Sequence, residues 1–289
     1  MDLTPLFSRG TPLHSQTSLR VGGVAAWSVT PNSSEQLREA LRIASSEGLP
    51  WFCLGSGANV LFDDSGFPGL VIHTSRLQGS HRRGETLSVA AGESLSRIAR
   101  QACEDGLSGL EWACGIPGTV GGAVSMNAGA HGGQMADILV SADSASIDGV
   151  FQRSVTELGL GYRTSAYREG ELEEIVTGVV LQLVRSTRDR TRREADRLLG
   201  IRRTTQPKGA SAGCIFRNPP QPPTAGELLD RAGCKGLRVG RAVVSERHAN
   251  FILNEGHENA SDILTLIDQM RERVRKAFSV ELETEIVIV

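Results

Sequence analysis

The glycine-rich segment from Gly115 to Ala130 is the feature that most constrains how this 289-residue chain can fold. Four glycines and a proline fall within the nine residues from Gly115 to Ala123. Glycine and proline destabilise the interiors of helices and strands, so the segment predicts backbone that a ligand such as a diphosphate or a flavin approaches closely. The alternative is a buried, glycine-rich crossing between two elements.

A second loop of small residues, Gly55 to Leu61, follows a short strand predicted over Trp51 to Leu54. Small side chains leave backbone N–H groups unobstructed, which favours phosphate binding. No Gly-Lys-Ser/Thr follows, which excludes a Walker loop, and the third glycine and following helix of a Rossmann fingerprint are missing. An ordinary tight turn is the alternative.

The charge and cysteine content exclude several classes of protein. The chain carries 31 basic and 33 acidic residues, whereas a nucleic-acid-binding domain is strongly basic. Its five cysteines form no C-x-x-C pair and offer neither a zinc site nor a disulfide framework. Because no apolar run reaches membrane-spanning length and Met1 to Gly10 lacks a secretory layout, we expect a cytoplasmic protein.

Helical periodicity predicts three amphipathic helices. Their apolar faces are Leu37, Ala40, Leu41 and Ala44; Leu95, Ile98, Ala99 and Ala102; and Ile263, Ile267, Met270, Val274 and Phe278. Capping boxes are predicted at Ser33 with Gln36 and at Thr224 with Glu227, the second of which begins a short helix. The segment Thr187 to Arg203 carries seven arginines, and we interpret it as an exposed helix that links two domains and ends at Gly200.

Strands are predicted over Leu70 to His73, in several runs between Ile138 and Val184, and over Val280 to Val289. The order of helices, strands and glycine loops indicates an α/β or α+β protein.

Taken together, these segments resemble the UDP-N-acetylenolpyruvoylglucosamine reductase family, whose flavin-binding domain is of the vanillyl-alcohol oxidase (PCMH) type. The matching motifs keep the family's order and span nearly the whole chain. They are Arg20-Val21-Gly22-Gly23, Gly55 to Leu61, Gly115 to Ala130, Gly161-Tyr162-Arg163-Thr164-Ser165, Gly213 to Pro219, His248-Ala249-Asn250-Phe251 and Leu282-Glu283-Thr284-Glu285.

The resemblance implies an α+β fold in which two domains are joined by a linker helix. A PCMH-type FAD-binding domain of two subdomains, divided near residue 75, would cover residues 22–187. A linker helix over 188–204 and a smaller α+β substrate-binding domain over 205–289, ending in a catalytic strand, would follow. The interval from Arg163 to Ser211 leaves no room for the tyrosine-bearing loop of some members, so we expect the shorter subtype.

In that family FAD takes hydride from NADPH and passes it to the enolpyruvyl double bond of the UDP-sugar, forming UDP-N-acetylmuramate for peptidoglycan synthesis. The resemblance implies the same reaction here, with FAD bound non-covalently, NADPH as co-substrate and His131 as a loop residue near the flavin. The implied FAD-binding residues are Gly55, Ser56, Gly57, Ala58, Asn59, Val60, Leu61, Gly115, Ile116, Pro117, Gly118, Thr119, Gly121, Gly122, Ala123, Asn127, Gly129 and Ala130.

Two of the catalytic residues that the resemblance implies are Arg163 and Cys214. A guanidinium at Arg163 suits a carboxylate or the enolate formed by hydride transfer, although the residue alone is typical of a surface arginine. Cys214 stands where the family usually has the serine that protonates the substrate carbon. A thiol, with a reference pKa of about 8.5, is a stronger acid than a hydroxyl and is sensitive to oxidation. A small buried hydrophobic residue is the alternative.

The third implied catalytic residue is Glu285. A final strand would place Glu281, Glu283 and Glu285 on one face, where an acid bordering apolar residues would have a raised pKa. Periodicity does not choose among the three acids, and a solvated strand face is the alternative. The resemblance selects Glu285.

Other substrate contacts carried by the resemblance are Asn218, which matches a substrate-binding asparagine, and its neighbour Arg217, together with Tyr162. The basic run from Arg185 to Arg203 either approaches the UDP diphosphate or forms the solvated linker helix, which we favour.

Two other functions compete with the reductase. One is an oxidase of the same fold that reduces O₂, and the other is a nucleotide-binding protein without catalytic activity.

Overall fold

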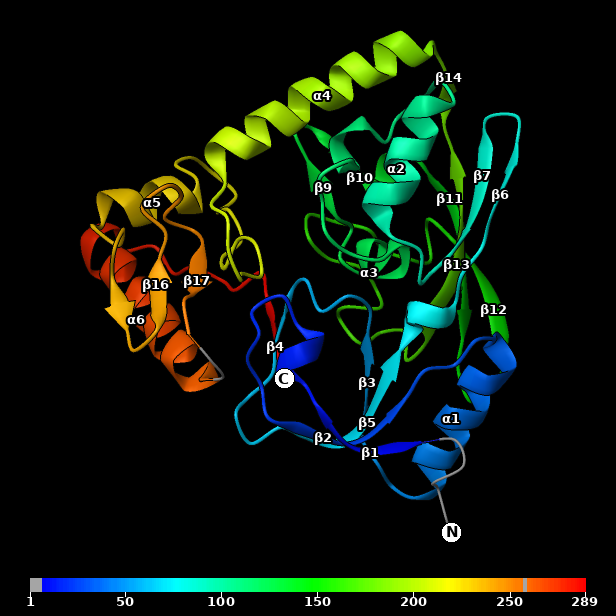
Figure 1. Ribbon diagram of the computed structural model, residues 1–289, viewed down its shortest axis with the longest axis horizontal. Coiled ribbons are helices and arrows are strands. Elements are labelled where there is room, and N and C mark those ends of the chain that lie inside the picture. Colours follow the sequence, from blue (N-terminus) through cyan, green and yellow to red (C-terminus); the bar gives the residue numbers. More distant parts are fainter. Residues whose placement is uncertain (1–6, 257–258) are drawn as a thin grey trace. The chain divides into compact units, whose positions relative to one another are not determined.

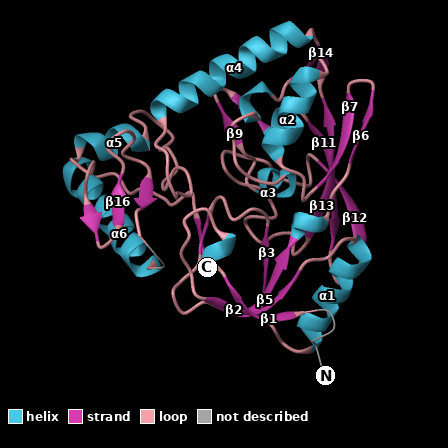
Figure 2. Ribbon diagram, in the orientation of Figure 1, coloured by secondary structure: helices cyan, strands magenta, loops and turns pink. Residues whose placement is uncertain are grey.

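A computed structural model of the chain describes residues 7–256 and 259–289, which form two compact units. The first unit contains residues 7–8, 28–56 and 69–202, and the second contains residues 9–27, 57–68 and 203–289. Helices and strands occur in both (Figure 1, Figure 2), which agrees with the expected α+β class.

An antiparallel sheet of five strands, in the order β12-β11-β13-β7-β6, forms the centre of the first unit. Its strands are β6 (Ser80–Arg83), β7 (Thr86–Ala90), β11 (Leu139–Ala145), β12 (Val150–Ser154) and β13 (Ile175–Gln182). Helix α3 (Val120–Ser125) packs against β13 and β7, while α1 (Ser34–Ser46) contacts β11. Buried residues of α2 (Leu95–Glu104) and α3 share one hydrophobic core with the sheet.

Short elements complete the first unit. β3 (Trp51–Leu54) pairs in parallel with residues 70–73 of β5 (Phe67–His73), in which the chain enters this unit. The remaining elements are β8 (Leu107–Ser108), β9 (Gly129–Ala130), β10 (Gly133–Gln134), β14 (Val184–Arg185) and the 3-10 turns η2 (Thr74–Arg76), η3 (Glu111–Ala113) and η4 (Met135–Asp137).

The second unit is built on a three-stranded antiparallel sheet of β15 (Arg238–Val239), β16 (Ala242–Val244) and β17 (Ile252–Asn254). Helix α6 (Ala260–Phe278) packs against β15 and β16, and α5 (Ala225–Arg231) packs against α6. β4 (Val60–Leu61) pairs in parallel with β18 (Val287–Ile288). Strands β1 (Ser8–Pro12) and β2 (Val24–Val29) and the turn η1 (His14–Gln16) lie mostly in this part of the chain.

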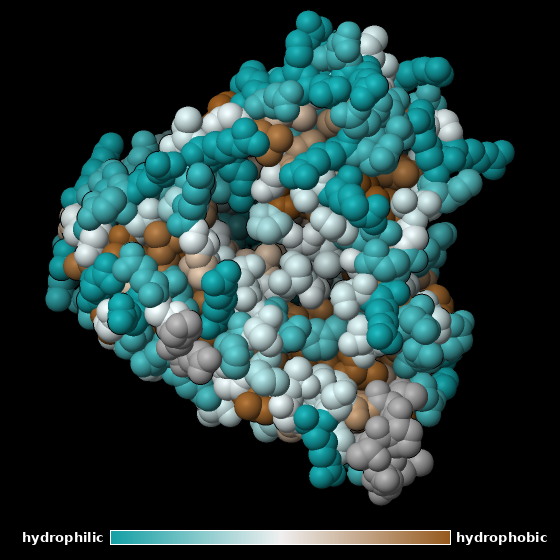
Figure 3. All heavy atoms as spheres, in the orientation of Figure 1, coloured by the Kyte–Doolittle hydropathy of each residue, from teal (hydrophilic) through white to brown (hydrophobic). Residues whose placement is uncertain are grey.

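The predicted arginine-rich helix exists as α4 (Arg188–Thr205), and the last of the five places where the chain passes between the units, from residue 202 to residue 203, lies within it. Only Thr191, Ala195 and Leu198 are buried along it, and its visible surface in Figure 3 is mostly hydrophilic. The predicted end at Gly200 is wrong. Nothing lies within 4 Å of a Cβ added at Gly200, so a glycine on this solvated helix costs only about 1 kcal/mol and does not stop it.

The other helices follow the predicted periodicity. All eight apolar residues predicted for the first two helices are buried, and so are Ile263, Ile267, Met270 and Val274 of α6, whereas Phe278 is partly exposed. Thr224 and Glu227 form the predicted capping box. At α1, Ser33 accepts from the N–H of Gln36, but the Gln36 side chain accepts from Asn32 rather than from Ser33.

The predicted final strand is wrong over most of its length. Between Val280 and Val289 only β18 is a strand, and Thr284 forms an isolated bridge with Phe216. Leu282 and Ile286 are buried, but Ile288, two residues further along, is 45% exposed. The segment bonds first to residues 215–217 and then to residues 59–61, so it cannot keep one strand register throughout.

No helix within residues 7–256 and 259–289 is both long enough and apolar enough to cross a membrane.

A buried carboxylate ties three strands of the five-stranded sheet together. Glu174, just before β13, is 7% exposed and accepts hydrogen bonds from Ser144 on β11 and Arg153 on β12. Burial raises the pKa of Glu174, but the hydrogen bonds and charge of Arg153, helped by Ser144, outweigh it and lower the pKa. The folded protein therefore favours the ionised carboxylate.

We predict that Glu174→Gln lowers the free energy of unfolding by about 1.5–3 kcal/mol at pH 7, because charge-assisted hydrogen bonds are lost. The folded pKa lies below the unfolded value of about 4.3, so this contribution is complete above that pH and is lost as pH falls through the folded pKa. Urea unfolding at pH 7 and at lower pH should show the difference from the parent shrinking. Glu157→Gln, at an exposed partner of Arg153, is the control and should change stability less; a pH-independent difference for Glu174→Gln would contradict the prediction.

Candidate functional site

The glycine-rich segment is anchored by its backbone. Thr119 caps α3 by accepting the N–H of Gly122 at 3.3 Å, while the N–H groups of Val120 and Gly121 donate to the carbonyls of Glu93 and Ala91, both at 2.9 Å. Sequence reasoning did not anticipate this six-residue helix inside the segment. Its two glycines are tolerated because the neighbouring backbone supplies hydrogen bonds at its start.

Different physical constraints explain why glycine occupies individual positions of the segment. A Cβ at Gly121 would lie 2.8 Å from the Cβ of Ala91, so close packing excludes any side chain there. At Gly118, which has φ of +144°, nothing lies within 4 Å of an added Cβ, and Gly122 is exposed. The segment therefore offers bare, accessible backbone at Gly118 and Gly122, which fits the close approach of a diphosphate or a flavin.

The two predicted glycine loops meet in the first unit. A side chain at Gly55, at the end of β3, would collide with the hydroxyl of Thr119. Ser56 follows Gly55 as the last residue of the first unit before the chain enters the second. The two loops that are implied to bind FAD therefore approach each other closely at Gly55 and Thr119.

The rest of the first loop, Gly57 to Leu61, lies in the second unit. Gly57 has φ of +63° and packs directly on the backbone of Gln16, and its carbonyl accepts from Ser18. The side chain of Asn59 donates to the carbonyl of Glu285 at 3.2 Å. Within this unit the loop is therefore tied to the segment that carries one predicted catalytic acid.

Asn127 holds the end of the glycine-rich segment. It is 1% exposed and has φ of +39°. Its side-chain amide donates to the carbonyl of Gly161 at 2.8 Å and to Gln134, and it accepts from the N–H of Ala136 at 2.9 Å. These bonds connect the segment to the turn that carries Arg163, so the side chain of Asn127 serves mainly to shape the loop.

Arg163 binds the same segment. Its backbone has φ of +56°, and its guanidinium donates to the carbonyls of Gly129 at 2.5 Å and Asn127 at 3.5 Å. The guanidinium also lies 5.3 Å from the ring centre of Tyr162, which is 51% exposed. The structure thus brings the predicted catalytic arginine onto two predicted flavin-binding residues of the first unit.

Cys214 lies in the second unit, on a segment bonded on both sides. Cys214 bridges Phe251, and Ile215 donates its N–H to the carbonyl of Asn250. On the other side, Glu285 donates its N–H to the carbonyl of Ile215 at 2.7 Å. The backbones of Cys214 and Glu285 are therefore held next to each other.

The three acids of the last segment differ in environment. The side chains of Glu281 and Glu283 are 61% and 79% exposed and lie 3.8 Å from Arg271 and 3.9 Å from Arg217, respectively. Glu285 is half-buried, with its backbone held by Ile215 and Asn59. This contrast, which strand periodicity could not supply, agrees with the choice of Glu285.

The predicted substrate residues of the second unit, Arg217 and Asn218, follow Cys214 on the same segment. Arg217 donates its N–H to the carbonyl of Glu283, and its Nε is buried without a hydrogen-bond partner in the described part of the chain. Asn218 accepts from the N–H of Ala225 at 3.1 Å and so holds the start of α5.

Sequence reasoning missed the roles of Asn250 and His248. Asn250 is 2% exposed and bonds the backbone of Phe216 through both ends of its amide. Burial, together with the charge of Lys235, lowers the pKa of His248, which favours the neutral ring that accepts from the N–H of Asn250 at 3.2 Å. The His-Ala-Asn-Phe motif was visible in the sequence, but nothing local indicated its contacts.

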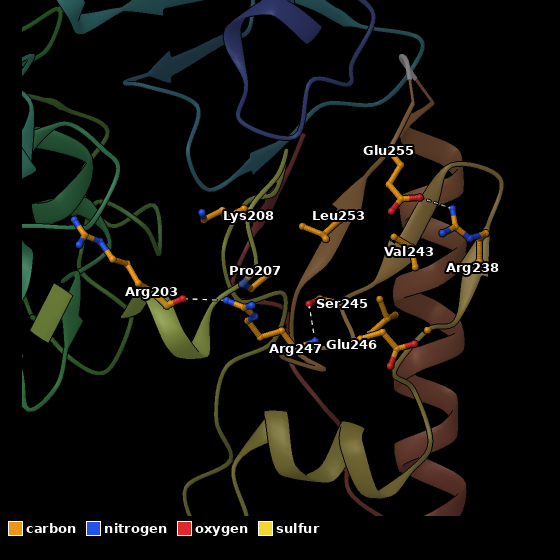
Figure 4. Close-up of a pocket in the computed structure, with 12 residues that line it drawn as sticks. Arg203, Pro207, Lys208, Arg238, Val243, Ser245, Glu246, Arg247, Leu253 and Glu255 are labelled. Carbon is orange, nitrogen blue, oxygen red and sulfur yellow. Dashed lines mark hydrogen bonds and ion pairs between the residues drawn. The ribbon is translucent and has the colours of Figure 1, made fainter. Parts of the chain in front are cut away.

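A cleft of about 690 Å³ opens in the second unit on the sheet of β15–β17 (Figure 4). In its wall Arg238 pairs with Glu255 at 2.8 Å, and Arg247 donates to the carbonyl of Arg203 at 3.0 Å. Neither Cys214 nor Glu285 lines it, so this cleft is not the centre of the predicted proton chemistry. Within residues 7–256 and 259–289, no cluster of three or more His, Cys, Asp or Glu side chains could hold a metal ion.

We predict that Asn127→Ala lowers the free energy of unfolding by about 1–3 kcal/mol, because the partly buried carbonyl of Gly161 and N–H of Ala136 lose their partners. The loosened loop should also retain less flavin through gel filtration, read from the ratio of visible to 280-nm absorbance. Asn127→Asp keeps the acceptor for Ala136 and should fall between the alanine variant and the parent. Parent-like stability and flavin content of Asn127→Ala would rule out this role of the side chain.

Comparison with known families divides the chain in two. Residues 25–154 match the FAD binding domain family, and residues 206–289 match the family described as UDP-N-acetylenolpyruvoylglucosamine reductase, C-terminal domain.

Similar proteins cover nearly the whole chain. A UDP-N-acetylenolpyruvoylglucosamine reductase from Synechococcus sp. (strain JA-3-3Ab) is 45% identical over 96% of this chain and 89% of its own length. A second, from Symbiobacterium thermophilum, is 44% identical over 97% of this chain and 91% of its own length. The crystal structure of the UDP-N-acetylenolpyruvylglucosamine reductase of Thermus caldophilus is similar to this one, with a TM-score of 0.84. The match covers 98% of this chain and 97% of that one, and the two sequences are 38% identical.

These matches confirm the expected fold, with an FAD-binding domain and a C-terminal domain, and FAD as the cofactor. The chain belongs to the UDP-N-acetylenolpyruvoylglucosamine reductase family and is an FAD-dependent oxidoreductase.

Proposed function

We propose that this chain reduces the enolpyruvyl group of UDP-N-acetylenolpyruvoylglucosamine to UDP-N-acetylmuramate with NADPH, as a step of peptidoglycan precursor synthesis. The observation that carries the proposal is similarity over almost the full chain, 45% identity to a reductase of this name, including both matched domains. We also infer the domain limits 22–187, 188–204 and 205–289, the shorter subtype without the tyrosine-bearing loop, and a cytoplasmic location.

FAD held by this chain would supply the redox chemistry, which is hydride transfer from NADPH to the substrate double bond. We assign its binding to the backbone of the loops Gly55 to Leu61 and Gly115 to Ala130. The accessible glycine backbone at Gly118 and Gly122 and the contact of Gly55 with Thr119 support this assignment. Asn127 and Arg163 hold the second loop in shape.

Cys214 is the proton donor in this proposal. Saturating a carbon–carbon double bond requires a hydride on one carbon and a proton on the other, and the thiol of Cys214 delivers that proton. Its backbone bridges Phe251 on one side, and the next residue, Ile215, is bonded to Glu285 on the other, which limits the positions that the sulfur can reach. A thiol is acidic enough for this role, because its reference pKa of about 8.5 lies near neutral pH.

Arg163 and Glu285 complete the catalytic set. The guanidinium of Arg163 stabilises the negative charge that develops on the carboxyl-conjugated system when hydride arrives, as a charge-assisted donor does best. Glu285 is the half-buried acid of the last segment and handles a proton near Cys214, whose neighbour Ile215 it contacts through the backbone.

The substrate itself is bound by Tyr162, Arg217 and Asn218. The buried Nε of Arg217 supports this assignment, since a buried donor with no protein acceptor in the described part of the chain is available to an oxygen of a ligand. The exposed ring of Tyr162 offers a stacking or hydrogen-bonding surface next to Arg163.

We predict that purified protein is yellow and oxidises NADPH rapidly only when UDP-N-acetylenolpyruvoylglucosamine is present. Anaerobic stopped-flow should show two separate half-reactions, flavin reduction by NADPH and flavin reoxidation by the UDP-sugar. Turnover independent of the UDP-sugar, with O₂ as acceptor, would instead favour an oxidase. A colourless protein would favour the nucleotide-binding alternative.

We predict that Cys214→Ala leaves flavin reduction by NADPH unchanged and slows reoxidation by the UDP-sugar about 10²–10⁴-fold, the usual effect of losing a general acid. Cys214→Ser restores a hydroxyl donor and should recover much of that step. The matched control is Cys53→Ala, a thiol of β3 outside the proposed site. If Cys214→Ala reoxidises its flavin at the parent rate, the residue is not the proton donor.

A further inference from the structure

Asn250 completes the backbone pairing of the segment that carries Cys214. Its amide oxygen accepts the N–H of Phe216 at 2.9 Å, and its amide nitrogen donates to the carbonyl of the same residue at 2.8 Å. Its own carbonyl accepts the N–H of Ile215 at 2.9 Å. One buried residue therefore bonds both residues that follow Cys214.

The side chain of Asn250 pairs with Phe216 as the backbone of a neighbouring β-strand would. A primary amide presents a donor and an acceptor side by side, as the backbone of a neighbouring strand does, and it satisfies both polar groups of Phe216. Phe216 is 1% exposed, so water cannot replace either bond. Among natural side chains of this length, only asparagine carries an uncharged donor and acceptor in this arrangement.

Asn250 is itself held in place. Its N–H donates to Nδ1 of His248 at 3.2 Å, and the rings of His248 and Phe251 lie 4.9 Å apart. Phe251 in turn bridges Cys214. The turn from His248 to Phe251 thus contacts the Cys214 segment at three successive residues.

Other backbone hydrogen bonds hold the opposite side of the Cys214 segment. Arg217 donates its N–H to the carbonyl of Glu283, and Glu285 donates its N–H to the carbonyl of Ile215. Loss of the Asn250 amide would leave these bonds in place. The segment would remain in the structure, but Phe216 would lose both of its bonds to Asn250, and only the backbone contacts of Cys214 and Ile215 would remain on that side.

We propose that Asn250 is a positioning residue for proton transfer, which it supports by fixing the backbone next to Cys214. This inference rests on the proposed function of Cys214 as proton donor. Asn250 influences proton transfer only indirectly, through the backbone of Ile215 and Phe216 that it holds. Its loss should therefore affect protonation of the substrate and leave flavin reduction by NADPH unaffected.

The test is a double-mutant cycle on flavin reoxidation by UDP-N-acetylenolpyruvoylglucosamine, measured in anaerobic single turnovers of the holoenzyme. Asn250→Ala should slow reoxidation about 10- to 100-fold in the parent, the usual effect of a displacement near 1 Å. In the Cys214→Ala background it should change the rate less than about twofold, because the group that it positions is already gone. Flavin reduction by NADPH should be unchanged in all four proteins.

Asn254→Ala is the matched control. Asn254 also donates to a backbone carbonyl, that of Leu19 at 2.8 Å, and accepts a backbone N–H, that of Gly256 at 3.1 Å. Its removal should lower stability by a similar mechanism and leave reoxidation within about twofold of the parent. If Asn250→Ala does not fold, Asn250→Asp, which keeps the acceptor for Phe216, goes through the same cycle with a smaller expected effect.

The outcomes separate this inference from the proposed function. Equal slowing by the Asn250 variant in the presence and absence of the Cys214 thiol would overturn the positioning role while leaving Cys214 as proton donor. A parent-like rate for Asn250→Ala would overturn it as well. If Cys214→Ala alone reoxidises at the parent rate, the proposed role of Cys214 fails, and the role of Asn250 fails with it.

Discussion

The first unit depends on the hydrogen bonds that hold the backbone of its glycine-rich segment in place. A loop of glycines presents its backbone to a ligand only if something else keeps it from collapsing or fluctuating, because glycine loses more conformational entropy on ordering than any other residue. Here the carbonyls of Ala91 and Glu93 receive the first N–H groups of α3, and the hydroxyl of Thr119 caps its start. Ala91 also fills the space where Gly121 lacks a side chain, so packing and hydrogen bonding fix the same stretch.

In the second unit, a side chain helps the backbone to hold an irregular segment in place. The segment around Cys214 has no long strand on either side, and its partners are an asparagine amide and an irregular C-terminal segment. Asn127 in the first unit has a similar task, since its amide links the glycine-rich segment to the turn of Arg163. In both units a buried asparagine substitutes for backbone pairing next to a residue with a proposed catalytic role, where regular secondary structure would not leave room for a site.

Local sequence signals predicted the parts of the fold that local physics determines. The apolar faces of α1 and α2 and the capping box of α5 follow from periodicity and from contacts three or four residues apart. The end of α4 was missed because a solvated glycine weakens a helix without ending it. Contacts such as Asn127 with Gly161, or Asn250 with Phe216, join residues 34 positions apart, and no spacing rule predicts them. The candidate site residues came from the resemblance to a family, and their geometry came from the structure alone.

The irregular C-terminal segment has a consequence for the chemistry. In a continuous strand Glu281, Glu283 and Glu285 would share one face and similar solvation, and no one of them would differ much in proton affinity. The chain instead changes its bonding partner from residues 215–217 to residues 59–61 near Glu285, which leaves that residue half-buried while Glu281 and Glu283 stay in solvent beside arginines. Departure from strand geometry therefore gives three identical side chains different environments, and the one nearest the backbone of Cys214 is the one that is partly withdrawn from water.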